Sequence, residues 1–387
     1  MKKYLRFLCG PVLVMVAIAG VAWGGSWMWL GFAITMAVSI AGDAFLGDDV
    51  GEPDYRHPWI FMLMMYSALP LLAILALVYA WMLGSGDFLG IGTLAQSYLG
   101  WDMFAARADT SALDLVGATL STGLLFAVSG TDVGHELTHR TTEPVSMFFG
   151  RWMLAFTWDA QFAIEHVYGH HERVCTPRDP ATAYRGENAY HFIVRSTLGQ
   201  VRSAWRLEKE RLAKRDIPLW SWRNRMLRGW LMTGAITLMF FVAAGWLGAA
   251  LFTVSALFGK SVLEVVNYFE HYGLVRVDGE PVQPRHSWNS NRNMSNLILH
   301  NVTRHSHHHA KGDVPFWELR SFPDAPTLPY GYLTSLLIIY LAPGLYKRMM
   351  TPKLIEWDRH YATPQERVLA AEQNRNSRID ELSAAAT

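Results

Sequence analysis

Long apolar runs alternate with charged segments along the chain, and their lengths indicate membrane-spanning helices. A helix needs about 20 mostly apolar residues to cross the hydrocarbon core of a bilayer. Six runs approach this length: Phe7 to Trp23, Trp27 to Leu46, Trp59 to Leu83, Leu113 to about Val133, Leu227 to Trp246, and Leu247 to about Asn267. The pattern predicts an all-α membrane protein with about six transmembrane helices, in which the first two and the last two form hairpins.

Three features need separate interpretation. A cleaved signal peptide is the alternative for the first run, but the second run follows closely and no Ala-x-Ala site precedes a polar region. The apolar stretch Leu328 to Tyr346 is interrupted by Pro329 and Pro343, so we expect a partly buried or re-entrant helix there. Asp43 lies in the second run, and a carboxylate in lipid is costly, so we expect it to face the interior of the bundle or the interface.

The positions of the basic residues predict the orientation. Lys3 and Arg6 precede the first run, and the segment 134–226 is rich in arginine, whereas the loop 84–112 contains only Arg107. Positive residues collect on the cytoplasmic side of membrane proteins. We therefore expect a multi-pass protein of a bacterial-type inner (plasma) membrane with both termini in the cytoplasm. Its parts would be four transmembrane helices (1–133), a cytoplasmic segment (134–226), a transmembrane hairpin (227–270), and a cytoplasmic cap with the C-terminal tail (271–387).

Composition removes some classes of function. Charged residues make up 17% of the chain, against about 25% in soluble proteins. A net charge of +1 without a basic patch does not indicate nucleic-acid binding. The two cysteines, Cys9 and Cys175, are too few for an iron–sulfur or rubredoxin-type site. Electrons for any redox reaction would therefore come from a separate carrier.

Histidines cluster in four motifs, and every cluster falls in a part of the chain expected on the cytoplasmic side. Residues four apart share a helix face, so paired histidines at this spacing can point at one metal ion. Imidazoles suit iron, zinc and copper. Nine imidazoles are too many for the coordination positions of one ion, but they are about right for two ions. The candidate metal ligands are His135, His139, His166, His170, His171, His271, His305, His308 and His309.

The spacing within the motifs also indicates which rings can pair on one helix face, but it does not assign each histidine to one of the two ions. His135 and His139 are four apart, and His166 and His170 repeat that spacing, which would turn His171 toward a neighbouring position. His305 and His309 are again four apart. A glutamate lies next to a candidate ligand in three motifs, and such a carboxylate can hold a metal-bound imidazole in place. We expect this role, rather than surface ion pairs, for Glu136, Glu165 and Glu270.

Other interpretations of the histidines explain less. The motif His135-Glu-x-x-His139 occurs in zinc proteases, with the glutamate as general base, but such a site would need only one further ligand. A loose metal-binding tract on the surface is typical of repetitive sequence, which the His305 motif is not. A metal transporter would place ionisable groups near the middle of the bilayer rather than beyond the helix ends. The isolated histidines His57, His191 and His360 are expected to be ordinary, and His286, His300 and His307 stay open.

The ordered motifs resemble those of a known family. His135-Glu-x-x-His139-Arg, Glu165-His-x-x-Gly-His-His171, Asn267-Tyr-x-Glu-His271-Tyr-Gly-Leu and His305-Ser-x-His-His309-Ala are similar to the motifs of integral-membrane alkane 1-monooxygenases. This family, in the fatty acid desaturase-like superfamily, also includes the hydroxylase subunit of xylene monooxygenase. The stretch His286-Ser-Trp-Asn-Ser-Asn291 looks like that of alkane hydroxylases. The tail from Pro352 to Arg367 looks more like the branch that hydroxylates the methyl groups of xylene and cymene.

The resemblance implies a function. A terminal or benzylic methyl group of a hydrophobic hydrocarbon would be hydroxylated to a primary alcohol by dioxygen, at two non-haem iron ions held by the nine histidines. Electrons would arrive from a rubredoxin or ferredoxin-type donor with an NAD(P)H-dependent reductase. His307 stands where alkane hydroxylases commonly have Asp, which leaves the ligands of that motif open. A fatty-acyl desaturase or lipid hydroxylase is the alternative enzyme, but the order and content of the motifs point away from it.

Overall fold

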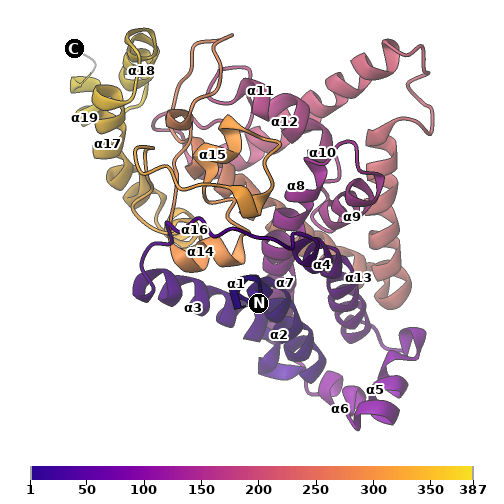
Figure 1. Ribbon diagram of the computed structural model, residues 1–387. Helices are drawn as coiled ribbons and strands as arrows, with labels where there is room; N and C mark the ends of the chain where they lie inside the picture. Colours follow the sequence, from indigo (N-terminus) through magenta and orange to yellow (C-terminus); the bar gives the residue numbers. More distant parts are fainter. Residues whose placement is uncertain (1, 386–387) are drawn as a thin grey trace.

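The computed structural model describes residues 2–385, and the regular elements among them are all helices (Figure 1). Within these residues, five helical segments are long and apolar enough to cross a membrane: Lys3–Trp23, Gly25–Phe45, Trp59–Leu83, Ala112–Thr138 and Arg225–His271. The prediction of an all-α, multi-pass membrane protein is confirmed, and each of the six predicted runs coincides with helix.

The spanning segments are assembled from short and long helices. They are α1 (Lys2–Leu5), η1 (Arg6–Leu8) and α2 (Cys9–Trp23); η2 (Gly25–Trp29) and α3 (Leu30–Phe45); α4 (Trp59–Leu83); α7 (Ala112–Leu125), η4 (Phe126–Thr131) and α8 (Asp132–Thr138); and α13 (Arg225–His271). The connecting helices before α13 are η3 (Phe88–Gly90), α5 (Ile91–Leu99), α6 (Met103–Ala108), α9 (Pro144–Ala155), α10 (Phe162–Glu165), η5 (His166–His170), α11 (His171–Arg173) and α12 (Ala189–Ala213). After α13 come η6 (Pro284–His286), α14 (Asn293–Ile298), α15 (His305–Ala310), η7 (Phe316–Glu318), α16 (Tyr332–Leu341), α17 (Pro343–His360), α18 (Pro364–Asn376) and α19 (Asp380–Ala384).

Helix α13 is a hairpin rather than one straight rod. Its backbone leaves helical geometry at Ala244 and at Gly245, whose φ of 60° lies in the left-handed region that glycine tolerates. The rings of Phe240 and Phe252 stack with centroids 4.6 Å apart, whereas twelve residues of straight helix would separate them by about 18 Å. The chain therefore turns back on itself, and the predicted pair of helices on either side of residue 246 is confirmed.

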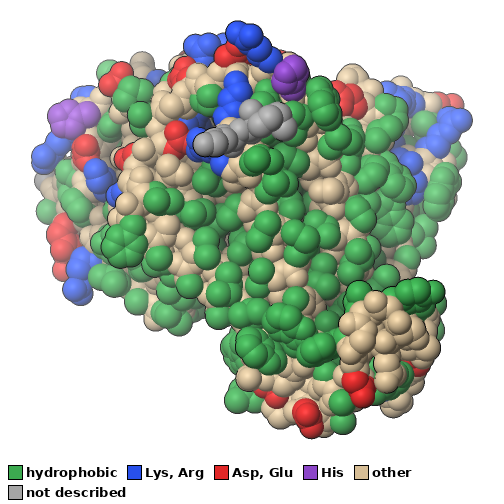
Figure 2. All heavy atoms as spheres, turned by 60° about the horizontal axis from the view of Figure 1, so that its bottom comes forward, with side chains coloured by type: hydrophobic (Ala, Val, Ile, Leu, Met, Phe, Trp, Pro, Cys, Tyr) green, Lys and Arg blue, Asp and Glu red, His purple; other side chains and the backbone are tan. Residues whose placement is uncertain are grey.

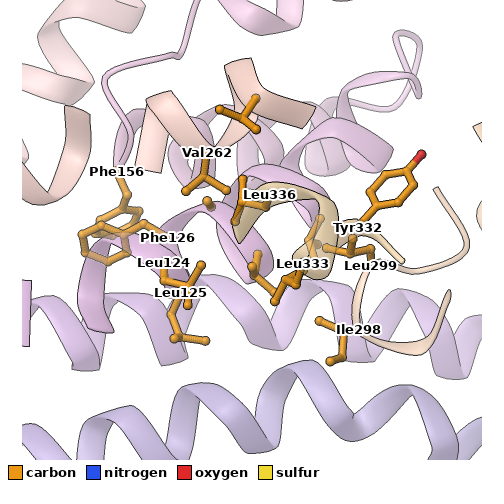
Figure 3. Packing of buried hydrophobic residues seen from close by; sticks show 14 of the residues in the cluster. Leu124, Leu125, Phe126, Phe156, Val262, Ile298, Leu299, Tyr332, Leu333 and Leu336 are labelled. Atoms are coloured by element: carbon orange, nitrogen blue, oxygen red, sulfur yellow. The ribbon is translucent and has the colours of Figure 1, made fainter. Parts of the chain in front are cut away.

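The apolar stretch from Leu328 to Tyr346 does not form a seventh crossing. It contains α16, whose 10 residues extend about 15 Å, half the thickness of the hydrocarbon core. The side chains of Leu333 and Leu336 are buried and pack toward Val262 of α13 (Figure 3). The expectation of a short, partly buried helix is thus confirmed.

The two ends of the helix bundle carry different helices and loops. Helices α5 and α6 lie at one end of the bundle, and α11, α12, α15 and the tail lie at the other (Figure 1). On the face shown in Figure 2, hydrophobic side chains cover most of the area between the ends, and Lys and Arg side chains gather along the upper edge and the sides of the view. The histidine motifs and the loop 84–112 are therefore on opposite ends, as the predicted orientation requires, although the identity of the cytoplasmic side stays a prediction.

Asp43 in α3 faces the interior of the protein, as expected from the cost of a carboxylate in lipid. It is 4% exposed, and its Oδ1 accepts a hydrogen bond from the backbone N–H of Ser295 at 2.8 Å. The Ser295 hydroxyl donates to Oδ2. Gly331 lies so close that a Cβ there would overlap the Asp43 carboxylate. This carboxylate therefore joins α3 to α14 and to the start of α16.

A second buried charge lies in the returning half of α13, where the sequence pattern had not singled it out. The Nζ of Lys260 is 2.6 Å from Oδ2 of Asp159 and 2.6 Å from Oε1 of Glu264. The Gln200 amide of α12 donates to both oxygens of Glu264, at 2.8 and 2.9 Å. Because each buried charge has a partner, the cluster can hold α13 against α12 and the turn before α10.

The contact between Gly331 and Asp43 predicts the effect of one substitution. Gly331→Ala should destabilise the protein by about 1–3 kcal/mol, because the added methyl group forces α16 away from the Asp43 carboxylate. Thermal unfolding of the purified protein in detergent measures the change. Gly344→Ala is the matched control, since no atom lies within 4 Å of a Cβ at that helical position. An equal loss of stability in both variants would contradict the argument.

Candidate metal centre

The structure brings the nine predicted histidines together in two groups. The five-histidine group contains His135, His139, His166, His171 and His308, and the four-histidine group contains His170, His271, His305 and His309. One ring nitrogen of each member lies within 4.8 Å of those of all other members of its group. The rings come from helix ends far apart in sequence. Convergence of this kind is expected of a metal site rather than of scattered surface histidines.

The five-histidine group has the spacing of ligands around one ion. The Nε2 atoms of His135 and His308 are 3.0 Å apart, those of His171 and His308 3.1 Å, and those of His139 and His166 3.2 Å. Imidazole nitrogens bind divalent transition metals at about 2.1 Å, so two such ligands at right angles lie about 3 Å apart. The donor set therefore fits a metal ion.

The four-histidine group contains ring nitrogens that need a partner. The Nε2 atoms of His271 and His305 are 3.2 Å apart. Both ring nitrogens of His309 and Nε2 of His170 are buried without a hydrogen-bond partner among the described residues. Such an unsatisfied buried group costs about 1–3 kcal/mol. A bound metal ion would satisfy these nitrogens, and this is a second observation that fits metal binding.

The pairing predicted for the second motif is wrong, and the local backbone explains why. His166 shares its group with His171, at an Nε2–Nε2 distance of 3.0 Å, while His170 belongs to the other group. The spacing argument assumed an α-helix, in which residues four apart share a face. Residues His166–His170 instead form η5, a π-helical turn. Its wider turn places residues five apart on one face, so His166 aligns with His171.

Elsewhere the helical spacing holds. His135 and His139, four apart at the end of α8, lie in one group, and so do His305 and His309 in α15. His308 also lies in α15 but joins the five-histidine group, so this single helix of six residues serves both groups. A second π-helical turn, η4, precedes α8 in the fourth spanning segment.

Burial favours the neutral form of the five-histidine group, which is the form that binds metal, whereas in the other group burial is outweighed by the charge of Asp179, which raises the pKa of His170. Burial lowers the pKa of His139 to about 4. The pKa values of His166, His171 and His308 also lie well below the ordinary value, first because of burial and then because of the neighbouring histidines. At neutral pH these rings therefore have lone pairs available and no proton to displace.

Hydrogen bonds fix which nitrogen of several rings faces its group. Nδ1 of His170 donates to Oδ2 of Asp179 at 2.9 Å, and Nδ1 of His271 donates to the carbonyl oxygen of His286 at 3.0 Å. In the neutral form of each ring, Nε2 then carries the lone pair that faces the group. Asp179 was missed by the sequence analysis because it lies in a loop nine residues after His170, without helical spacing to identify it.

The three predicted glutamates have different surroundings. Oε2 of Glu270 lies 3.2 Å from Nε2 of His305, and its Oε1 accepts a hydrogen bond from the Tyr332 hydroxyl at 2.9 Å. Glu136 accepts hydrogen bonds from the Arg140 side chain and from the backbone N–H of Phe316. Burial, followed by the charge of Asp179, raises the pKa of Glu165 to about 7. The roles of the three glutamates at the site stay predictions, and Glu270 is the one in contact with a ring nitrogen of a candidate ligand, Nε2 of His305.

The histidines that the sequence left open lie outside both groups. Nδ1 of His300 donates to Asp132 at 2.7 Å. Nδ1 of His307 accepts from the backbone N–H of Arg320 at 2.8 Å. Nε2 of His286 donates to Glu366 at 2.7 Å. The isolated His57, His191 and His360 are exposed.

An apolar cavity adjoins both groups. His135 and His166 of the five-histidine group and His305 of the four-histidine group form part of its wall. Most of the remaining wall is aliphatic, and it includes Val262, Leu263, Leu299, Val302, Leu333 and Leu336. Figure 3 shows four of these side chains gathered between α13, α16 and the segment that precedes α15. A hydrophobic molecule could therefore lie with one end at the histidines.

Comparison with known proteins agrees with this arrangement. The model of the fatty acid desaturase family matches residues 110–336, which include all four histidine motifs. Alkane 1-monooxygenase 1 of Pseudomonas aeruginosa is 36% identical over 289 residues, 73% of each chain. Alkane 1-monooxygenase of Pseudomonas putida is 32% identical over 92% of this chain and 86% of its own. The xylene/toluene monooxygenase hydroxylase component XylM of Pseudomonas putida is 30% identical over 96% of this chain and 95% of its own.

The chain belongs to the fatty acid desaturase family, whose model matches more than half of its length. Within that family it is grouped with the integral-membrane alkane 1-monooxygenases and the xylene monooxygenase hydroxylase component, which match it over most of the chain. The resemblance inferred from the motifs is confirmed.

The contact between His170 and Asp179 leads to a prediction about metal affinity. Asp179→Asn should weaken metal binding about 10- to 100-fold, because the negative charge that fixes Nδ1–H of His170 is lost. Metal retention during dialysis against a graded series of chelator concentrations measures the change. Asp278→Asn removes an exposed carboxylate of the same type and should leave retention at the parental level. Parental retention by the Asp179 variant would show that this contact has no part in metal binding.

Proposed function

We propose that this chain is a membrane monooxygenase that hydroxylates a terminal or benzylic methyl group of a hydrophobic hydrocarbon, such as an alkane or alkyl-aromatic. The observation that supports this most directly is the apolar cavity with two histidine groups in contact with it. The alkane and xylene monooxygenases among its relatives support the same class of substrate.

The chemistry requires a redox metal. An unactivated C–H bond has neither an acidic proton nor an electrophilic carbon, so acid–base or nucleophilic side chains cannot cleave it. Two iron ions held by the nine histidines would supply the redox chemistry toward dioxygen. The donor set fits such ions, because neutral nitrogen ligands suit iron. The balanced reaction consumes the hydrocarbon, one dioxygen, two electrons and two protons, and it yields the alcohol and one water.

The protein's own residues would bind and orient the substrate. The aliphatic wall from α13 and α16 would hold the hydrocarbon and exclude water, so that one methyl group stays next to His135, His166 and His305. Glu270 and the hydroxyl of Tyr332 form a hydrogen-bonded pair among the polar residues of the cavity wall. They could hold a proton or the hydroxyl group of the product.

Electrons and substrate would reach the centre from different directions. The two cysteines exclude an internal iron–sulfur carrier, so a rubredoxin or ferredoxin-type donor with its NAD(P)H-dependent reductase would deliver electrons. By the positive-inside rule, the histidine-bearing end, both termini and the donor would be in the cytoplasm, with the spanning helices in the inner membrane. A lipid-soluble substrate would enter from the bilayer between the helices.

Isotope labelling tests the proposed reaction. Membranes that contain the protein, a rubredoxin or ferredoxin and the matching reductase should convert octane, xylene or p-cymene into an alcohol that carries ¹⁸O from labelled dioxygen. A desaturase would instead produce a double bond without incorporation of the label, and a metal transporter would move metal without consuming oxygen. Either of those outcomes would replace the proposal.

Removal of His139, a candidate ligand of the five-histidine group, should reduce iron binding at that group. His139→Ala should abolish activity and lower the iron content of the purified protein, while the protein still inserts into the membrane, because the other elements of the fold are unchanged. Inductively coupled plasma analysis gives the iron content. His191→Ala, an exposed histidine on α12, serves as the control and should behave like the parent. Full activity of His139→Ala would show that the ligand assignment is wrong.

A further inference from the structure

The C-terminal tail is connected to the loop that follows His271. In α18, Oε1 of Glu366 accepts a hydrogen bond from Nε2 of His286 at 2.7 Å, and its Oε2 accepts one from Nε of Arg285 at 3.0 Å. The side chains of Glu366 and His286 are 2% and 0% exposed. Burial by itself would raise the pKa of Glu366, but the hydrogen bonds from His286 and Arg285 outweigh it and hold the pKa at about 2. The tail thus presents a carboxylate to this loop.

The hydrogen bonds of His286 define the protonation of its ring. Nδ1 accepts a hydrogen bond from the backbone N–H of Gln283 at 3.0 Å, so the proton is on Nε2, which donates it to Glu366. Both ring nitrogens are therefore used and the ring is buried, which determines the position of the backbone at residue 286.

That backbone position bears directly on His271. The carbonyl oxygen of His286 accepts the Nδ1–H of His271 at 3.0 Å and the thiol of Cys175 at 3.0 Å. Because Nδ1 of His271 carries its proton, Nε2 has a free lone pair and faces Nε2 of His305 at 3.2 Å. A displaced carbonyl at residue 286 would release the His271 ring from this orientation.

The same loop is attached to the residues on both sides of His271. The backbone N–H of Trp288 donates to the carbonyl oxygen of Glu270 at 2.8 Å, and its indole N–H donates to that of Tyr272 at 3.0 Å. A second tail residue, Trp357 of α17, donates its indole N–H to the carbonyl oxygen of Arg285 at 2.7 Å. The loop 284–288 is therefore held between the end of α13 and the tail.

We propose that Glu366 is a positioning residue for the four-histidine group, acting through His286 on the orientation of His271. This inference rests on the proposed function, because it requires His271 to be a metal ligand. The stretch that begins at His286 and the tail from Pro352 to Arg367 were noted in the sequence only for their resemblance to related families. The inference gives both of them the same role, which is to hold the His271 ring in its orientation.

The test uses Glu366→Gln in the full-length protein, reconstituted with iron. Glutamine keeps the length of the side chain and can still serve the N-terminal cap of α18 with Thr363. It cannot accept from His286 and Arg285 with a full negative charge. We expect about tenfold weaker retention of one of the two irons, an altered Mössbauer signal from that iron, and a lower kcat at unchanged KM.

The matched control is Thr363→Ala. It removes the hydroxyl that accepts from the backbone N–H of Glu366 at 3.2 Å but leaves the contact between Glu366 and His286. This variant should lower the unfolding temperature while the Mössbauer spectrum and iron retention stay parental, which separates loosening of the tail from misorientation of His271.

A second variant tests the same chain of contacts independently, in case Glu366→Gln fails to fold. His286→Leu keeps the backbone carbonyl and removes the ring that anchors it, so it should reproduce the effect of Glu366→Gln. The double variant should retain iron and turn over as well as either single variant, because both substitutions interrupt the same chain of contacts from Glu366 through His286 to His271. Parental spectra and kcat in both single variants would overturn the inference. A parent protein that binds no iron would instead contradict the proposed function, so the two failures are distinguishable.

Discussion

If the nine imidazoles hold metal ions, each must turn an unprotonated nitrogen toward the others of its group, and this requirement is the constraint on which the surrounding structure depends. A neutral ring has one protonated nitrogen, so an acceptor for that proton on the outer side stabilises an inward lone pair. Asp179 is that acceptor for His170, and the carbonyl oxygen of His286 is the acceptor for His271. Each acceptor has to be held in turn, which accounts for the dense hydrogen bonding of the loops around the centre.

The same constraint is met at the second histidine motif by an irregular backbone. The π-helical turn η5 lets three histidines within six residues serve two groups, with His166 and His171 on one side and His170 on the other. A regular α-helix would have placed His166 and His170 together and divided the ligands differently. The local backbone at this point therefore decides which histidines belong to which group.

Much of the fold could be predicted from the sequence because its physical causes are local. Twenty apolar residues in a row have few alternatives to a spanning helix, and a carboxylate such as Asp43 has to avoid lipid wherever its partner lies. The set of nine histidines could also be predicted, because within each motif the histidines are close together in sequence and their spacing is visible without knowledge of the tertiary structure. The division into two groups could not, because it depends on a π-helical turn. Asp179 contacts His170, and Glu366 contacts His286, only through tertiary structure, and neither carboxylate has a fixed spacing from the residue that it supports.

The buried charges around Lys260 have a consequence for biosynthesis. Lysine at the centre of a spanning segment costs about 2.5–3.5 kcal/mol during insertion by the translocon. Within α13 only Glu264 is its partner, and Lys260 meets Asp159, which precedes α10, when α13 packs against that turn. The half of α13 after residue 245 is thus a weak insertion signal by itself. The preceding half contains no charged residue between Arg228 and the turn, and it is made first. Its entry into the bilayer, with the short turn at Gly245, would carry the charged half in with it, so this part of the protein is best regarded as a single unit of membrane insertion.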